Sequence, residues 1–179
     1  MLRPTLLTRD SDPILIEALR PILNANLSYF TRPLPEMTPE GQQRWWKIED
    51  HANVRVFLWR DDERPWEAVA FSMLTDHGDY ASPFFAVAPA HWSSGFGDQI
   101  IKHYIEAAGK PLKGEQLASN GAIRHLNTKN GWYVTGEKDG VQTLYHPGPG
   151  PRVPEWIRRH IRAELGYPDY DAILKGLDG

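Results

Sequence analysis

The sequence predicts an α+β fold, in which a mixed, mostly antiparallel sheet carries helices on its faces. Runs with strand composition alternate with runs of helical period, and short polar turns join three of the strands in succession. With 179 residues, 41% of them hydrophobic, the chain has the size of one ordinary globular domain with a substantial core.

The first third of the chain contains one expected strand and two expected helices. The strand covers Arg3–Thr8, and the helix after it is capped by Asp12 and begins with Pro13. Pro21 should kink or end this helix, because proline has no N–H for the helical ladder. The second helix is expected from Thr38 to Asn53.

Three strands and one helix form the middle of the chain. The strands are expected over Val54–Trp59, Trp66–Leu74 and Pro83–Val87, and the turns DDERP and TDHGD make them an antiparallel meander. The period then changes, and a helix with one apolar stripe follows from Gly97 to Gly109.

A strand, a helix and a hairpin complete this part of the chain. We expect the strand over Leu112–Ala118 and a helix that Asn120 opens and Gly131 stops. The hairpin covers Trp132–His146 and turns at Lys138–Gly140. A sheet built in this order is mixed rather than doubly wound and parallel.

A change of composition divides the chain near its end. Prolines and glycines crowd together in HPGPGPRVP, so we expect one domain over residues 1–147 and a Pro/Gly linker with a tail over residues 148–179. The tail reads as a short amphipathic helix, with Ile161 and Leu165 on its apolar stripe. Such a helix packs on its own domain, on a second copy of the chain or on another protein.

Composition excludes several classes of function. A net charge of -3 gives no nucleic-acid footprint, although Arg158, Arg159 and Arg162 in the tail leave a local contact open. No segment is apolar for the length of a membrane span, and the absence of cysteine fits a reducing compartment. We therefore expect a soluble, untargeted, cytoplasmic protein. The spacing of the histidines fits no metal pair, so no metal is expected.

Two glycines stand at the junction of a strand and a helix, in the stretch AVAPAHWSSGFGDQII. Glycine lets a backbone approach an anion closely, and a helix N-terminus carries partial positive charge. Gly95 and Gly97 therefore fit either an anion site or a simple corner of the chain.

Three blocks of residues between Met1 and His146 carry a resemblance to a known family. The first is a strand end, a proline turn and a glycine loop: Val87, Pro89, Trp92, Ser93, Ser94, Gly95, Phe96 and Gly97. The second is an asparagine, an apolar helix and a Lys, Gly, aromatic ending: Asn120, Ile123, Leu126, Lys129, Gly131 and Trp132. The third is the early stretch TPEGQQRWW. In these blocks the chain resembles the GNAT superfamily of acyl-CoA-dependent N-acyltransferases.

The resemblance implies a central sheet that is splayed at a site for acetyl-CoA. Backbone N–H groups at the start of the helix would hold the pyrophosphate of coenzyme A: Ser94, Gly95, Phe96, Gly97 and Asp98. The pantetheine arm would then run between the splayed strands, bonding backbone near Val87 and meeting the side chain of Asn120.

Two residues depart from the family pattern. Trp92 stands where the family usually has Arg or Gln, and its indole would cover the adenine or the arm instead. Asn127 lines the cofactor site where many members carry a tyrosine that protonates the leaving thiolate, and asparagine is no acid at neutral pH. Tyr145, Tyr133, His125 or water would then supply this proton.

Candidate bases lie in the turn TDHGDY. The pKa of a histidine suits His77 to the task, with Asp79 orienting it or acting through water. These residues are equally consistent with ordinary turn chemistry, and Glu67 on the preceding strand is a further candidate. The acceptor side would be lined by residues 24–36, where Phe30 is expected to pack and Arg32 is left open.

Two functions remain open at this point. One is an acyl-CoA-dependent N-acyltransferase with acetyl-CoA as donor and an unidentified amine as acceptor, which Gly95, Gly97 and Asn120 favour. The other is an inactive module of the same fold within a larger complex, for example a phage particle, which Asn127, Trp92 and the tail favour. We lean to the enzyme.

Overall fold

The structure, a computed structural model, describes residues 1–48 and 51–149. The strands in these residues are β1 (Leu2–Leu7), β2 (Val54–Asp61), β3 (Arg64–Asp76), β4 (Ala81–Val87), β5 (Leu112–Leu117), β6 (Tyr133–Lys138) and β7 (Val141–His146). The helices are α1 (Pro13–Glu17), α2 (Leu19–Asn24), α3 (Pro39–Ile48), α4 (Phe96–Ala108) and α5 (Gly121–Lys129), with short 3-10 turns η1 (Leu27–Tyr29) and η2 (Pro89–His91).

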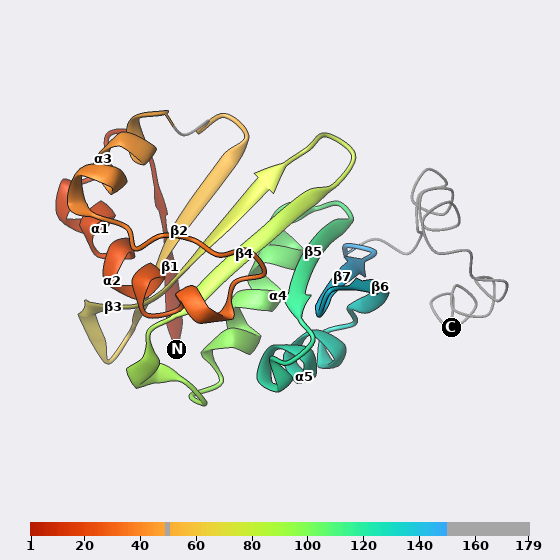
Figure 1. Ribbon diagram of the computed structural model, residues 1–179. Helices are drawn as coiled ribbons and strands as arrows, with labels where there is room; N and C mark the ends of the chain where they lie inside the picture. The colour runs from red at the N-terminus through yellow and green to blue at the C-terminus, as the bar shows by residue number, and fades with distance from the viewer. Residues whose placement is uncertain (49–50, 150–179) are drawn as a thin grey trace, which may run out of the picture.

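The strands form one sheet with the order β1-β2-β3-β4-β5-β7-β6. All neighbours are antiparallel except β4 and β5, which are parallel. The prediction of a mixed, mostly antiparallel sheet with an antiparallel meander and a final hairpin is therefore confirmed (Figure 1).

The parallel pair is joined at one point. Ala81 pairs with Leu112, and the Ala81 N–H donates to the Pro111 carbonyl at 2.9 Å. The backbone N–H and C=O groups of successive residues in a strand point alternately toward its two neighbouring strands. After Ala81, the next residue of β4 whose backbone groups point toward β5 is Pro83, which has no N–H to donate. The ladder stops there, and β4 and β5 diverge toward Val87 and Leu117 as the predicted splay (Figure 1).

Helices cover both faces of the sheet. On one face α4 packs against the strands in a core that includes Ile100, Ile101 and Tyr104, with Leu126 of α5 at its margin. On the other face α1, α2 and α3 bury a second core around Ile22. Figure 1 shows the loop between α2 and α3 crossing the end of β4 toward β5. The splay thus lies between two helical layers.

The first helical segment breaks earlier than Pro21. α1 ends at Glu17 and α2 begins at Leu19. Proline at position 21 has no N–H to donate to the carbonyl of Glu17, four residues earlier, which accounts for the break. The second expected helix is shorter than predicted, because residues 51–53 form a turn before β2. The predicted tail helix lies outside the described residues.

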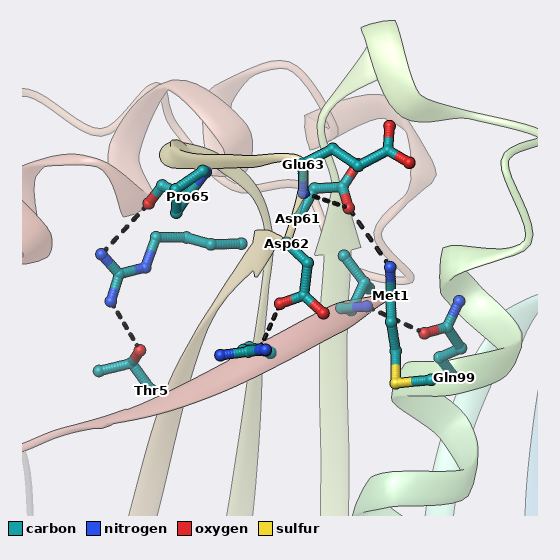
Figure 2. A network of polar contacts seen from close by, with 10 residues as sticks. Met1, Thr5, Asp61, Asp62, Glu63, Pro65 and Gln99 are labelled. Atoms are coloured by element: carbon teal, nitrogen blue, oxygen red, sulfur yellow. Dashed lines mark hydrogen bonds and ion pairs between the residues drawn. The ribbon is translucent and has the colours of Figure 1, made fainter.

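The turn between β2 and β3 is bonded to the start of β1, and the start of β1 is bonded to α4 (Figure 2). The carboxylate of Asp61 accepts hydrogen bonds from the Glu63 N–H at 3.4 Å and from the Met1 amine at 3.5 Å. The side-chain oxygen of Gln99, on α4, accepts a hydrogen bond from the Leu2 N–H at 3.1 Å. The first turn of α4 is thereby bonded to β1, the edge strand of the sheet.

Candidate functional site

The loop from β4 to α4 leaves the N-terminus of α4 open. Ser93 and Gly95 both have positive φ, 65° and 78°, and Gly95 is the cap residue of α4 without a side-chain hydrogen bond. By contrast, Asp12 caps α1 at 2.9 Å and Asn120 caps α5 at 3.2 Å. The first N–H groups of α4 therefore have no side-chain cap, and such groups bind anions.

The two glycines serve different purposes. A Cβ at Gly95 would meet nothing within 4 Å, so it is the left-handed backbone that requires glycine there. A Cβ at Gly97 would lie 2.9 Å from Leu126 Cδ1 and 3.7 Å from Phe85 Cε2. Gly97 therefore allows α4 and α5 to approach each other, and Gly95 shapes the loop.

The carbonyl of Val87 is shared by two side chains. Asn26 Nδ2 donates to it at 3.0 Å and Trp92 Nε1 at 2.9 Å. The Trp92 ring also contacts the ring of Tyr29 edge to face, at 5.4 Å between centroids, and both rings remain 44% exposed. The strand alternation places the Val87 N–H on the splayed side as well. The loop after α2 and the loop before α4 thus meet at the end of β4.

A buried histidine anchors the same loop to β3. His91, in η2, bonds through Nε2 to the Glu67 carboxylate at 2.9 Å, and Arg64 lies 3.0 Å from the same carboxylate. The hydrogen bond with His91 holds the pKa of Glu67 below its usual value. Glu67 is therefore engaged in fixing the loop. The sequence analysis missed His91, whose position after a proline turn gave no signal of its partner.

Asp98 is neutralised by its neighbours. Lys102 lies 2.8 Å from one carboxylate oxygen, and Lys129 at 3.2 Å and Asn130 at 2.9 Å contact the other. The hydrogen bond from Lys102, followed by that from Asn130, holds the pKa of Asp98 well below its usual range. Lys102 and Lys129 therefore both form ion pairs with the Asp98 carboxylate in the first turn of α4.

Asn127 belongs to a row of side-chain amides. Its Nδ2 donates to Gln116 Oε1, Gln116 Nε2 donates to Gln142 Oε1, and Gln142 Nε2 donates to Glu137 Oε2, each at 2.8 Å. The three amides are buried. Gln116 lies four residues after buried Leu112 on β5, so the two share one face of the strand, but the partners of Gln116 were not predicted.

The predicted base candidates lie at the other end of β4. His77 and Asp79 are exposed in the β3–β4 turn, where the His77 ring stacks on Tyr80 with 4.7 Å between centroids. Val87 lies six positions after Ala81 along the strand, about 20 Å at the usual rise per residue. The structure therefore brings Trp92 and the glycine loop together, but it leaves His77 and Asp79 at the opposite end of β4. Buried Tyr145 lies on β7, opposite Lys113 and Tyr133.

The loop after α2 reaches β5 across the splay. Thr31 Oγ1 donates to Glu115 Oε2 at 3.0 Å, and Arg32 lies 4.0 Å from the same carboxylate. The Phe30 ring packs on Phe84 with 5.0 Å between centroids, as expected. Glu115 therefore faces this loop, on the side where residues 24–36 were expected to meet an acceptor.

The described residues contain neither a group that could hold a metal ion nor a helix that could span a membrane. In residues 1–48 and 51–149, no group of His, Asp or Glu is arranged to hold a metal ion. Among those same residues, no helix combines the length and apolarity needed to cross a membrane.

Comparisons with known proteins agree on the family. The family model described as Acetyltransferase (GNAT) family matches residues 17–131. A search of curated proteins finds no match. The fold is similar to spermidine N-acetyltransferase from Vibrio cholerae in complex with CoA and spermine, with 19% identity, a TM-score of 0.64 and coverage of 82% of this chain and 95% of that chain.

Two further solved structures have the same fold. One is the ribosomal-protein-S18-alanine N-acetyltransferase from Escherichia coli, with 19% identity, a TM-score of 0.60 and coverage of 82% and 94% of the two chains. The other is a GCN5-related N-acetyltransferase from Kribbella flavida, with 17% identity, a TM-score of 0.64 and coverage of 82% and 97%. With the splayed sheet, the open helix and a family match over most of the domain, the chain belongs to the acetyltransferase (GNAT) family.

Proposed function

We propose that this protein is an N-acyltransferase that carries the acetyl group of acetyl-CoA to a primary amine. The observation that carries the proposal is the uncapped N-terminus of α4 at the splayed end of β4, away from the single β4–β5 pair. Backbone N–H groups from Ser94 to Asp98 would hold the pyrophosphate, since Gly95 leaves open space in front of them. The pantetheine arm would lie along β4 near Val87, with Trp92 at its side.

The transfer needs three events at the splay. The amine nitrogen attacks the thioester carbon, its proton passes to a base, and the C–S bond breaks to release a thiolate that takes up a proton. Backbone N–H groups on the unpaired edge of β4 would stabilise the oxyanion that forms in between. His77, oriented by Asp79, remains the proposed base for an amine that approaches from the β3–β4 turn, and Tyr145 remains the proposed acid.

The donor site can be tested before any acceptor is known. Binding of CoA and acetyl-CoA should raise the thermal midpoint by several degrees at about a hundredfold excess over Kd. Gly95→Asp should abolish the shift, because it places a negative charge where the pyrophosphate would lie. Gly95→Asn is the matched control, since Asn tolerates the left-handed backbone and carries no charge. A shift that survives Gly95→Asp would contradict the proposed pyrophosphate position.

Turnover can be read from the thiol that is released. The chain contains no cysteine, so a thiol reagent reports CoA without background from the protein. We propose polyamines and peptide N-terminal amines as the first acceptors, because the neighbouring folds are those of a spermidine and a ribosomal-protein-alanine acetyltransferase. His77→Gln and Tyr145→Phe should lower kcat and change its pH profile.

A second candidate is a module that binds the donor without transferring its acyl group. Asn127, at the position of the usual tyrosine, is the observation that favours it, because its amide is engaged with Gln116. Binding of CoA with no thiol release from any amine tested would favour this candidate.

A further inference from the structure

The row of amides beneath the splay has a fixed direction. Gln116 on β5, Gln142 on β7 and Glu137 on β6 are paired across the three strands, so their side chains share one face of the sheet. Asn127 of α5 meets the row at its inner end, and Glu137 at the outer end is exposed. The row therefore connects the surface of β6 with the buried side of α5.

The carboxylate sets the direction of every bond in the row. An ionised carboxylate accepts hydrogen bonds and donates none, so Gln142 must turn its NH2 group toward Glu137. Its oxygen then faces Gln116, and the oxygen of Gln116 in turn faces Asn127. Asn127 must use its NH2 group in this bond, and its Oδ1 is left as the acceptor.

That oxygen is buried and has no partner within the part of the chain that the structure describes. Asn127 is 6% exposed, so water does not solvate it freely, and a buried acceptor without a donor calls for an explanation. The preceding residue, Leu126, borders Gly97 together with Phe85 of β4. Consecutive residues of α5 thus lie beside β4 and beside β5, where the ladder between the two strands has stopped.

We propose that Asn127 Oδ1 is a positioned acceptor for a donor hydrogen on the arm of the bound acyl-CoA or CoA. The inference rests on the proposed function. The arm carries amide N–H groups in both ligands and an S–H group only in free CoA. Asn127 thus orients the arm rather than protonating the thiolate, and Glu137 sets its polarity from the surface.

The test reverses the direction of the hydrogen bonds in the row by a substitution at its outer end, away from Asn127. Lysine at position 137 donates and cannot accept, so Glu137→Lys should turn each amide around and present the NH2 group of Asn127 to the ligand. We expect the Kd for CoA, measured by calorimetry, to rise at least tenfold. Glu137→Gln should bind within threefold of the wild type, because its amide oxygen still accepts. Glu106→Lys, on the exposed face of α4, is the matched control for the charge change.

A second change should repair the first. Aspartate at position 127 has two acceptor oxygens and no donor. In Asn127→Asp alone, one of these oxygens faces the acceptor Oε1 of Gln116, and the two repel each other. In Glu137→Lys/Asn127→Asp the row is reversed, so the aspartate accepts a hydrogen bond from the NH2 group of Gln116 and presents its other oxygen to the ligand. We expect the double variant to recover both thermal midpoint and affinity relative to Asn127→Asp. A loss with CoA alone would identify the S–H donor, and a loss with both ligands an amide N–H or the hydroxyl of the arm.

Three outcomes would overturn the inference. If the wild type binds CoA and Glu137→Lys binds it equally well, Asn127 Oδ1 has no ligand to accept from, while the proposed function stands. If the double variant is no better than Asn127→Asp, the direction of the row is wrong. A wild type that binds neither ligand overturns the proposed function together with this inference.

Discussion

Gly95 and Gly97 are two positions apart, and each excludes a side chain for a reason of its own. Alanine at position 95 would hold a left-handed backbone, at a cost of about 1 kcal/mol. Alanine at position 97 would press on Leu126 Cδ1, at a cost of about 1–3 kcal/mol. Urea unfolding should show that each alanine variant has a lower free energy of unfolding than the wild type. Leu126→Val should relieve Gly97→Ala and leave Gly95→Ala unchanged, and equal coupling at both positions would contradict this assignment.

His146 makes the stability of the domain depend on pH. Burial lowers its pKa to about 4, and its Nδ1 accepts a hydrogen bond from the Gly148 N–H at 2.9 Å. The unfolded chain, with an ordinary histidine, binds a proton below about pH 6.5, and the folded chain does not. The unfolded state thus binds more protons, and stability falls by up to about 3 kcal/mol as the pH drops from 6.5 to 4.

Thermal unfolding at several pH values checks this expectation. His146→Gln should flatten the pH dependence between 6.5 and 4, although it lowers stability at pH 7 because the packing against Trp132 is disturbed. His125→Gln, at an exposed position, should leave the pH dependence as it is. An unchanged slope in His146→Gln would assign the acid sensitivity to other groups.

At the scale of elements, we expect Pro83 to keep the gap between β4 and β5 open, because it has no N–H to donate on the β5 side. Pro83→Ala would restore an N–H on the β5 side, and we expect the ladder to extend past Ala81. A narrower splay leaves less room for the arm, so CoA should bind several-fold more weakly. Pro65→Ala, near the exposed start of β3, controls for loss of a proline elsewhere in the sheet. Unchanged affinity in Pro83→Ala would mean that other residues hold the strands apart.

Helices and strands were largely predictable, and the contacts between them were not. The helix break before Pro21, the Asn120 cap and the final hairpin are each determined by residues that lie close together in the sequence, so a local sequence pattern predicts them. The end of α3 was misplaced because the pattern has no strong stop signal before β2. The row from Glu137 to Asn127 depends on the register of three strands, and the role of Gly97 on a residue in another helix.

The candidate site shows the same division. The glycine loop and Trp92 were predicted from the family resemblance, and the structure describes them together at the end of β4. His77 and Asp79 are near that loop in the order of the chain but a strand length away in space. Their catalytic role stays a prediction, since proximity in sequence along an extended strand does not bring side chains together.

At the scale of the whole molecule, the sheet consists of two leaves, β1–β4 and β5–β7–β6, which share one backbone pair. Each leaf is held by its own antiparallel ladders, so the smaller leaf should open without the larger one. Hydrogen exchange followed by mass spectrometry should show faster exchange in β5–β7–β6 than in β2 and β3. CoA should slow exchange along both leaves, and protection confined to one leaf would place the ligand elsewhere.

The shared carbonyl of Val87 has a kinetic consequence. Through it, Asn26 of the loop after α2 and Trp92 of the loop before α4 are bonded to one oxygen atom. A donor that settles against Trp92 therefore also fixes the loop that would receive the amine. An enzyme built this way should follow an ordered sequential mechanism, in which the acyl donor enters first and the order of arrival is set by two hydrogen bonds to a single peptide group.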